Sequence, residues 1–436
     1  MKLDTKTLIK EDLKHIWHPC TQMKDHETIP IIPIKSGKGV YLTDFEDNSY
    51  IDGVSSWWVN IFGHCNDYIN QKIKEQLDTL EHVIFAGFTH EPIVRLSQRL
   101  CKLAPKGLEK CFFADNGSSA IEVALKMSFQ YHQNKGQKRP IFVSLENSYH
   151  GETMGALAVG DVKLYKEVFD EILLKTIQTP VPKDQSEEEA QKAANALENI
   201  FIQDGEKISA FIIEPLVQCS GGMHMYHPLY ITLARSLCDK YDIHLIADEI
   251  AVGFGRTGTM FACEQAGVSP DFMTLSKGLT GGYLPLSVVL TTDKIYEAFY
   301  CDYSEYKAFL HSHSYTGNPL ACSAANATLD IFENDNIIEK NKEKIAYIAR
   351  KLEKFKNLKN VKKVRQTGMM AAVELIDYDA NLRINLKVFT YALERGVLLR
   401  PLGNVVYFMP PFVITCKEID TMMDVAYEAI ISLNTL

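Results

Sequence analysis

Two short, mostly apolar runs that end in chemically active residues constrain the fold of this chain most strongly. Ile243–Ala247 leads directly into Asp248 and Glu249, and Phe272–Leu275 is followed by Ser276 and then Lys277. Short apolar runs of this kind are typical of strands buried on both faces of a sheet. Open α/β sheets place their functional residues where the strands end. The sequence therefore predicts an α/β fold with a carboxylate and a lysine at one edge of a sheet.

The alternation of apolar runs with helical patterns extends from Asp67 to about Ser304 and predicts a largely parallel sheet covered by helices on both faces. The expected strands are Lys110–Ala114, Ile141–Leu145, Ala210–Ile213, Ile243–Ala247, Phe272–Leu275 and Leu286–Thr291, with helices at Ser118–Gln130 and Tyr230–Lys240.

A chain of 436 residues is long enough for roughly two or three domains. We expect residues 63–316 to form a large domain and residues 317–436 a smaller α/β domain that begins with a linking helix. Residues 1–62 should pack with the small domain. A hairpin is expected there between Val40–Asp44 and Tyr50–Gly53.

Composition and charge exclude several classes of protein. The formal net charge of −9, without a basic stripe to offset it, argues against a nucleic-acid partner. The 10 cysteines show no CxxC spacing, which is typical of reduced thiols. The N-terminus lacks an apolar signal core, and no run approaches the length of a membrane span. We expect a cytoplasmic protein with no membrane partner.

Lys277 and Asp248 point to one particular chemistry. A lysine beside apolar residues can have its pKa lowered by desolvation and become a nucleophilic amine. A carboxylate in the same crevice can pair with a pyridinium nitrogen. Each residue also has a structural interpretation, because a strand-terminal Asp is often a helix cap and a Lys before Gly usually faces solvent.

The sequence motifs around these residues support the chemical interpretation. The runs IIEP, ADEIAVGFGRTG and LSKGLTGGYLPLS resemble the signature of the class III, fold-type I aminotransferases. The resemblance implies a transferase dependent on pyridoxal 5′-phosphate, with a mostly parallel sheet of the seven-stranded type in the large domain. In this family the lysine that matches Lys277 carries the cofactor. Lys277 and Asp248 are thus expected to be catalytic.

Two further loops follow predicted strands and suit the same cofactor. Gly117 and Ser118 open a helix, and a helix N-terminus favours a phosphate, although an ordinary serine cap is the alternative. Tyr149 matches the family position whose ring lies over the cofactor. Glu214 is expected to orient the cofactor face or a neighbouring side chain.

The loop HSHSYTGNP contains two histidines, His311 and His313, but their spacing and the lack of accompanying ligands argue against a metal site. The resemblance instead implies that Ser314 reaches the cofactor phosphate of a neighbouring subunit, so that a homodimer shares its active sites. His313 is expected at the cofactor and Ser312 at the substrate.

The ends of the chain narrow the resemblance within the family. HIWHPCTQM, GVSSWWVNIFGH, HVIFAGFTHEP and RPLGNVVYFMPPF look like the branch that acts on 8-amino-7-oxononanoate in biotin biosynthesis. Trp57 and Trp58 can line an apolar channel for this substrate, although core packing is the alternative for one of them. Arg400 offers a planar fork for its carboxylate. The other expected substrate-binding residues are Cys20, Tyr149, Arg256, Lys277, Ser312 and Tyr407.

One residue departs from that branch, and the amino donor stays open. Cys20 occupies a position where the branch often has an aromatic, commonly Tyr, and a thiol is smaller and a weaker donor. S-adenosylmethionine is the expected amino donor. Lysine is the alternative, because the run HSHSYTGN looks more like the lysine-using relatives than like the run HGPTFMGN found in other relatives. Another class III ω-aminotransferase, or a non-catalytic binding protein of this fold, are the remaining alternatives.

Overall fold

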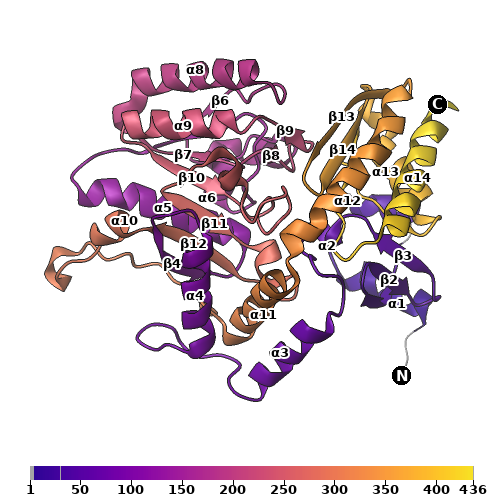
Figure 1. Ribbon diagram of the computed structural model, residues 1–436, viewed down its shortest axis with the longest axis horizontal. Coiled ribbons are helices and arrows are strands. Elements are labelled where there is room, and N and C mark those ends of the chain that lie inside the picture. The colour runs from indigo at the N-terminus through magenta and orange to yellow at the C-terminus, as the bar shows by residue number, and fades with distance from the viewer. Residues whose placement is uncertain (1–3, 30, 436) are drawn as a thin grey trace. The chain divides into compact units, whose positions relative to one another are not determined.

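The computed structural model describes residues 4–29 and 31–435, which form two compact units (Figure 1). Unit 2 contains Asp67–Ala346 and Arg365–Ala371. Unit 1 contains the described residues up to Asn66, with Tyr347–Val364 and the chain from Ala372 onwards. Unit 2 thus extends past residue 316, the expected limit of the large domain. The predicted domain limits themselves stay a prediction.

Unit 2 is built on a seven-stranded sheet, which confirms the predicted architecture (Figure 1). The order is β4-β12-β11-β10-β7-β5-β6, and β12 alone runs antiparallel to its neighbours. The strands are β4 (Leu108–Ala114), β5 (Ile141–Leu145), β6 (Thr176–Thr179), β7 (Ile208–Ile213), β10 (His244–Asp248), β11 (Phe272–Leu275) and β12 (Ser287–Thr292). Every residue of β7, β10 and β11 is buried, as expected for central strands.

The sequence did not predict β6, and its composition explains why. The strand TIQT is short, lies at the edge of the sheet and has intermediate burial at its first three residues. It therefore lacks the apolar run by which the central strands were found. A small ribbon of β8 (Val217–Gln218) with β9 (His224–Met225) was also not predicted.

Long helices pack beside the sheet. Apolar side chains of α5 (Gly117–Asn134) share a core with residues of β5, β7 and β11, among them Phe142, Ile212 and Phe272. The other longer helices of unit 2 are α3 (Asp67–Leu77), α4 (Glu91–Leu103), α8 (Glu187–Asp204), α9 (Leu229–Lys240) and α11 (Pro319–Asp335). Among the described residues, no helix is long and apolar enough to cross a membrane.

Unit 1 contains a four-stranded sheet in the order β1-β2-β3-β15. These strands are β1 (Ile34–Lys38), β2 (Tyr41–Asp44), β3 (Ser49–Asp52) and β15 (Val397–Leu398), and the expected hairpin is formed by β2 and β3. A three-stranded sheet combines β13 (Val361–Thr367), β14 (Met370–Leu375) and β16 (Val405–Phe408). The helices include α1 (Thr5–His15), α13 (Ile384–Leu393) and α14 (Cys416–Ser432).

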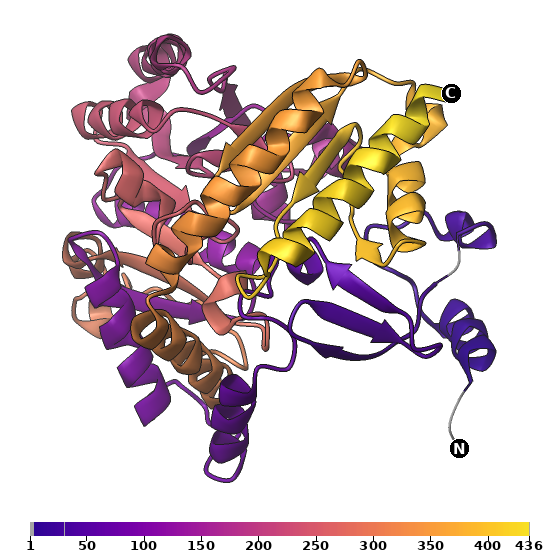
Figure 2. The same cartoon turned by 45° about the vertical axis from the view of Figure 1, so that its right-hand side comes forward.

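The helix α12 (Ile337–Leu352) passes from unit 2 into unit 1, where its C-terminal half runs beside α14 (Figure 2). Tyr347 and Lys351 both contact Asp420 of α14, at 2.8 and 2.6 Å. The start of α14 is fixed by a capping box, in which the Thr415 hydroxyl and the Glu418 carboxylate exchange hydrogen bonds with each other's backbone N–H.

Candidate active site

Lys277 follows β11 after a single residue and begins a short 3-10 turn, Lys277–Thr280. Its backbone is left-handed, with φ of 45°, which is uncommon outside glycine. The side chain is partly buried, and desolvation of its ammonium group lowers the pKa of Lys277. The Cys219 thiol and the carboxylates of Asp248 and Glu214 act in the opposite direction. Lys277 therefore has the environment expected of a reactive amine.

Asp248 ends β10, the strand beside β11, and is buried with 5% of its surface exposed. Its Oδ2 lies 2.7 Å from Nδ1 of the fully buried ring of His150. Its Oδ1 accepts the Ile250 N–H at 3.1 Å and lies 3.4 Å from Oγ1 of Thr274. Because a carboxylate only accepts, Nδ1 of His150 carries the proton and donates it.

His150 is a residue of the site to which the sequence alone did not assign a role. It follows Tyr149 in the run YHG, and that run was the available signal. Its other nitrogen, Nε2, is buried and has no hydrogen-bond partner among the described residues. The histidine is therefore fixed through Asp248 at one nitrogen only.

Glu214 lies just after β7, the strand on the other side of β10, and connects two loops. Its Oε1 accepts the N–H of Tyr149 at 2.9 Å, and its Oε2 accepts the N–H of Cys219 at 3.0 Å. Burial raises the pKa of Glu214 to about 7, and the nearby charge of Asp248 adds to this, while His150 opposes it. Glu214 thus holds the backbone of the Tyr149 loop and that of the loop at Cys219.

The predicted phosphate loop lies at the N-terminus of α5, where Asn116 caps the helix by accepting the N–H of Ser119. Gly117 and Ser118 supply the preceding N–H groups of the first turn, which have no acceptor within the helix itself. Gly151 comes so close that a Cβ atom there would lie 2.0 Å from Oγ of Ser118. The glycine, with φ of 125°, is therefore required for this approach.

The histidine loop lies against the same edge of unit 2. Nδ1 of His313 is 3.7 Å from Oδ2 of Asp115, directly before the phosphate loop. His311 lies between His313, at 3.2 Å, and Lys126, at 2.8 Å. Ser312 and Ser314 are both exposed.

These residues of unit 2 fit pyridoxal phosphate by their chemistry. A desolvated lysine suits an aldehyde, a buried carboxylate suits a protonated ring nitrogen, and a helix N-terminus suits a phosphate. Two observations in the same loops are consistent with a bound group. Nε2 of His150 is buried without a hydrogen-bond partner among the described residues, and Gly151 lies closer to Ser118 than any residue with a side chain could.

In unit 1 the two adjacent tryptophans have different environments. Trp58 is 4% exposed and its indole Nε1 donates to the Tyr407 hydroxyl at 3.0 Å. Tyr407 is itself 1% exposed, and the two rings pack edge to face. Trp57 is 42% exposed. Of the two alternatives for this pair, Trp58 thus takes the core position and Trp57 the accessible one.

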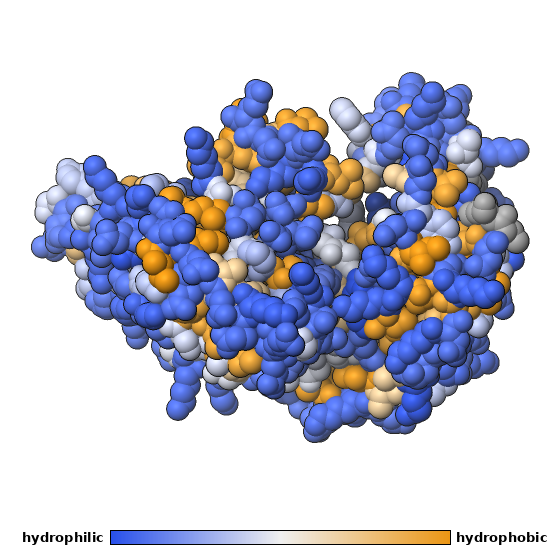
Figure 3. All heavy atoms as spheres, turned by 90° about the horizontal axis from the view of Figure 1, so that it is seen from above, coloured by the Kyte–Doolittle hydropathy of each residue, from blue (hydrophilic) through white to orange (hydrophobic). Residues whose placement is uncertain are grey.

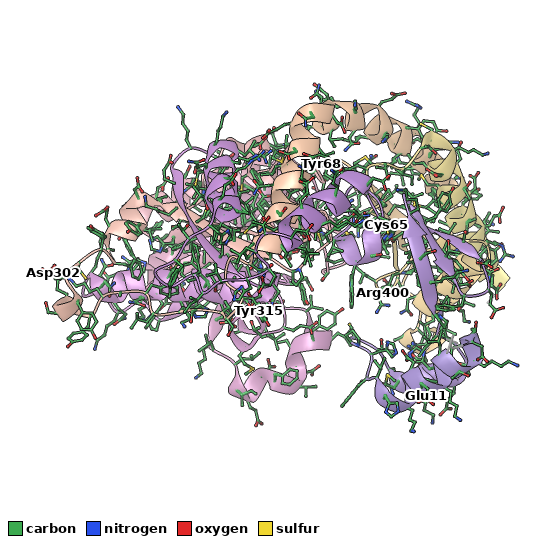
Figure 4. The ribbon with its side chains drawn as sticks, turned by 90° about the horizontal axis from the view of Figure 1, so that it is seen from below. Glu11, Cys65, Tyr68, Asp302, Tyr315 and Arg400 are labelled. Atoms are coloured by element: carbon green, nitrogen blue, oxygen red, sulfur yellow. The ribbon has the colours of Figure 1, made fainter. Side chains whose placement is uncertain are left out.

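Trp57 is brought together with two other expected substrate residues. The Arg400 guanidinium carbon lies 4.9 Å from the centre of the Trp57 ring, a cation–π distance. An Nη2 atom of Arg400 lies 3.5 Å from the carbonyl oxygen of Cys20. Both Cys20 and Arg400 are exposed, and Arg400 is labelled in Figure 4.

Arg256 differs from the surface location that its glycine neighbours favour. It is 1% exposed and its positive charge contributes to the lowered pKa of Lys277. Its carbonyl oxygen accepts the N–H of Met369 at 2.9 Å. The side chain is therefore a buried cation within the electrostatic environment of the lysine.

Comparison with known proteins identifies the family to which the chain belongs. The sequence pattern of the family described as Aminotransferase class-III matches residues 21–430. The adenosylmethionine-8-amino-7-oxononanoate aminotransferase of Helicobacter pylori is 54% identical over 414 residues, which cover 94% of each chain. That of Geobacter sulfurreducens is 44% identical over 437 residues, covering 97% of this chain and 96% of the other.

Solved structures show the same relationship. The crystal structure of adenosylmethionine-8-amino-7-oxononanoate aminotransferase from Methanocaldococcus jannaschii superposes with a TM-score of 0.95 at 39% identity, covering 98% of this chain and 99% of that one. An (S)-enantioselective omega-transaminase from Thermomicrobium roseum gives 0.94 at 31% identity, covering 99% of both chains. This chain belongs to the class III aminotransferase family, and it is an aminotransferase.

Proposed function

We propose that this enzyme transfers an amino group to the 7-ketone of 8-amino-7-oxononanoate to give 7,8-diaminononanoate in biotin biosynthesis, with S-adenosylmethionine as the donor. The observation that carries the reaction type is Lys277 at the end of β11, beside the strand that ends in buried Asp248. The relatives named above support the choice of substrate, because they are similar over nearly the whole chain.

Pyridoxal 5′-phosphate is the proposed cofactor. Lys277 would bind it covalently, Asp248 would pair with its ring nitrogen, and Tyr149 would lie over its ring. Gly117, Ser118 and His313 would hold it at the phosphate end. When bound, the cofactor withdraws electrons from the carbon that bears the amino group.

The protein's own residues then handle the proton and the charge. A Lys277 amine with a lowered pKa would move a proton at Nζ between the amino-bearing carbon of the substrate and the bound cofactor, in one direction with the donor and in the other with the acceptor. Asp248, held by His150 and by the Ile250 N–H, keeps a negative charge fixed in place.

The proposal assigns substrate recognition to a second set of residues. Trp57 would contact the apolar chain of the substrate and Arg400 its carboxylate. Cys20, Tyr149, Arg256 and Ser312 are further proposed contacts. Trp58 and Tyr407 would support this surface by packing beneath it rather than by contacting the substrate, because both side chains are buried.

We also propose a cytoplasmic homodimer in which Ser314 reaches the cofactor phosphate of the second copy. Exposed apolar and aromatic side chains of unit 2 support an interface between copies. They include Leu164, Val168, Ile172, Tyr300, Tyr303, Tyr306 and Leu310. Figure 3 shows one face of the molecule, on which orange apolar residues reach the surface among hydrophilic ones. Tyr300–Tyr306 lie at the projecting tip marked by Asp302 in Figure 4.

A spectroscopic half-reaction tests the proposal. The purified, cofactor-loaded enzyme is mixed separately with S-adenosylmethionine, lysine, ornithine and 4-aminobutyrate while the visible absorbance of the cofactor is followed. We expect S-adenosylmethionine alone to change the spectrum and 8-amino-7-oxononanoate to reverse the change. A protein that stays colourless with added cofactor would contradict the enzyme mechanism.

Lysine as the donor is the second candidate, favoured by the HSHSYTGN wording of the loop at His311–Asn318. A spectral change with lysine would keep the substrate and replace the donor. A response to ornithine or 4-aminobutyrate only would instead indicate a general ω-aminotransferase, to which the Thermomicrobium roseum structure is the corresponding neighbour.

A further inference from the structure

We propose that Asp52, supported by His64, is a positioning residue that fixes Trp57 and Arg400 as the recognition surface for the substrate carboxylate. The inference rests on the proposed function and deepens it, because it names what determines specificity at the acid end of the substrate. All the residues concerned belong to unit 1.

Asp52 is a fully buried carboxylate surrounded by donors. Its Oδ1 accepts the N–H of Val54 at 3.3 Å and the N–H of Ser56 at 3.0 Å. Its Oδ2 accepts the Ser56 hydroxyl at 2.7 Å and Nε2 of His64 at 3.0 Å. Four donors around two oxygens require a group that only accepts, which is an ionised carboxylate.

His64 is oriented by a third side chain. The amide nitrogen of Asn60 lies 3.1 Å from Nδ1 of His64, so that Nδ1 accepts and Nε2 carries the hydrogen that is donated to Asp52. The backbone of His64 exchanges two hydrogen bonds with Gly39, at 3.0 and 2.7 Å. A Cβ atom at Gly37 would lie 2.9 Å from Cβ of His64, so the histidine is closely enclosed.

This network holds an unusual turn. The four residues Ser55–Trp58 have φ values of 51°, 46°, 71° and 75°, all in the left-handed region that non-glycine residues avoid. Such a run persists only where surrounding contacts over-determine it. Asp52 supplies those contacts to Val54 and Ser56, and the Ser55 hydroxyl donates to the carbonyl of Met409 at 2.7 Å.

The turn decides which tryptophan faces which way. Trp58 is directed to Tyr407 in the core, whereas Trp57 lies at the surface beneath the Arg400 guanidinium. If Asp52 loses its hydrogen bonds, the turn can relax to negative φ and Trp57 moves away from Arg400. Arg400 then loses the indole ring that keeps its guanidinium group in one orientation.

Asp44 provides a matched control in the same small sheet. It is also buried, with 6% exposed, and accepts from Glu46 N–H, Asn48 N–H, the Asn48 amide and the Tyr50 hydroxyl. All four donors belong to the β2–β3 hairpin, so Asp44→Asn reproduces the loss of a buried carboxylate without touching the turn at Trp57.

The first experiment compares 8-amino-7-oxononanoate with its methyl ester in steady-state kinetics of the holoenzyme. In Asp52→Asn we expect KM for the acid to rise about tenfold with kcat nearly unchanged, while the ester is unaffected. His64→Gln, which can still donate from the Nε2 position, should keep the preference for the acid, and His64→Leu should lose it. Asp44→Asn should keep it.

Equal losses on acid and ester in Asp52→Asn, as for a merely destabilised enzyme, would overturn the proposal. If Asp52→Asn does not fold, the two His64 variants test the proposal instead. An equal preference for the acid over the ester in His64→Gln and His64→Leu would then overturn it.

A second readout needs no substrate. In a Trp17→Phe background, acrylamide quenching reports mainly on accessible Trp57, because Trp58 is buried. We expect Asp52→Asn and Arg400→Ala to increase the quenching of this fluorescence and Asp44→Asn to leave it unchanged. Unchanged quenching in Asp52→Asn would overturn the positioning role. If wild type does not use 8-amino-7-oxononanoate, the proposed function fails while this measurement still decides the role of Asp52.

Discussion

The surroundings of Lys277 in unit 2 and of Trp57 in unit 1 are built in opposite ways. The first takes its residues from the ends of buried parallel strands, where Asp248 and Glu214 end the next two strands on one side of the lysine strand. The second combines Trp57, which lies in a left-handed turn, with Arg400, which follows β15, and both side chains remain exposed. In unit 2 burial therefore controls the charge of the functional groups, whereas in unit 1 hydrogen bonds control the direction of the functional side chains.

Two buried carboxylates show the difference. Burial raises the pKa of Glu214 to about 7, because its two backbone N–H donors do not compensate for the loss of water. Burial also acts to raise the pKa of Asp52, but hydrogen bonds from His64 and Ser56 outweigh it and hold that pKa below its ordinary value. A buried carboxylate thus stays charged where enough donors surround it.

The largest expected effect is the loss of the reactive amine of unit 2. Lys277→Ala should abolish the absorbance band that marks covalent attachment of the cofactor and reduce transamination by about 10⁴-fold or more, because both the covalent bond and the proton carrier are removed. Absorbance and turnover are measured together, with Lys207→Ala as a control on an exposed lysine. Retained turnover would contradict the assignment.

The next effect tests the fixed charge beside that amine. Asp248→Asn should lower kcat about 10³-fold, because it removes a preorganised negative charge. His150→Leu should cost less, about tenfold, since the carboxylate then keeps its Ile250 contact but loses the imidazole donor. Both are measured as single-turnover rates of the donor half-reaction. An Asp248→Asn rate equal to that of wild type would remove the aspartate from the mechanism.

A smaller effect is expected in unit 1, and it should be confined to one substrate. Arg400→Ala should raise KM for 8-amino-7-oxononanoate about 50-fold, because a charge-assisted contact to the carboxylate is lost. The donor half-reaction should be unchanged. If the donor half-reaction falls equally, the two regions are not divided between recognition and chemistry in the way described.

The smallest effect concerns stability rather than rate. Burial raises the pKa of Glu249 to about 7, so between pH 4.5 and 7 the folded enzyme binds more protons at this residue than the unfolded chain does. The contribution to stability is fully present below the unfolded pKa and is lost as the pH rises through about 7.

Glu249→Gln lacks this titration and should gain stability relative to wild type by about 1–3 kcal/mol between pH 5 and pH 8. Urea unfolding of both proteins at the two pH values measures the difference. Parallel pH dependence of the two proteins would show that Glu249 does not titrate in this range.

Much of the fold could be predicted because burial leaves a pattern in the chain. The central strands at Ile141, Phe272 and Leu286 are continuous apolar runs, and they occur within a residue or two of where they were expected. The edge strand Thr176–Thr179 could not be found, because half-buried polar residues carry no such pattern.

The candidate functional residues of unit 2 could also be predicted from the sequence. Asp248 follows its apolar run directly and Lys277 after one residue, and parallel strands bring their carboxyl ends to one edge of a sheet. Their residue types and their place after a strand therefore depend only on local sequence. The roles of these residues in the reaction stay a prediction.

Only the tertiary structure decided the partners. His150 and Asp248 are 98 positions apart, and Trp58 and Tyr407 are 349 apart. No local pattern distinguishes Trp57 from Trp58, since the choice between surface and core depends on a turn that Asp52 and His64 hold from outside it. The sequence by itself determined the class of fold and the residue types at the strand ends, because strand burial and residue chemistry are local. Pairing, burial of charge and side-chain direction depend on distant segments, so only the folded chain determined them.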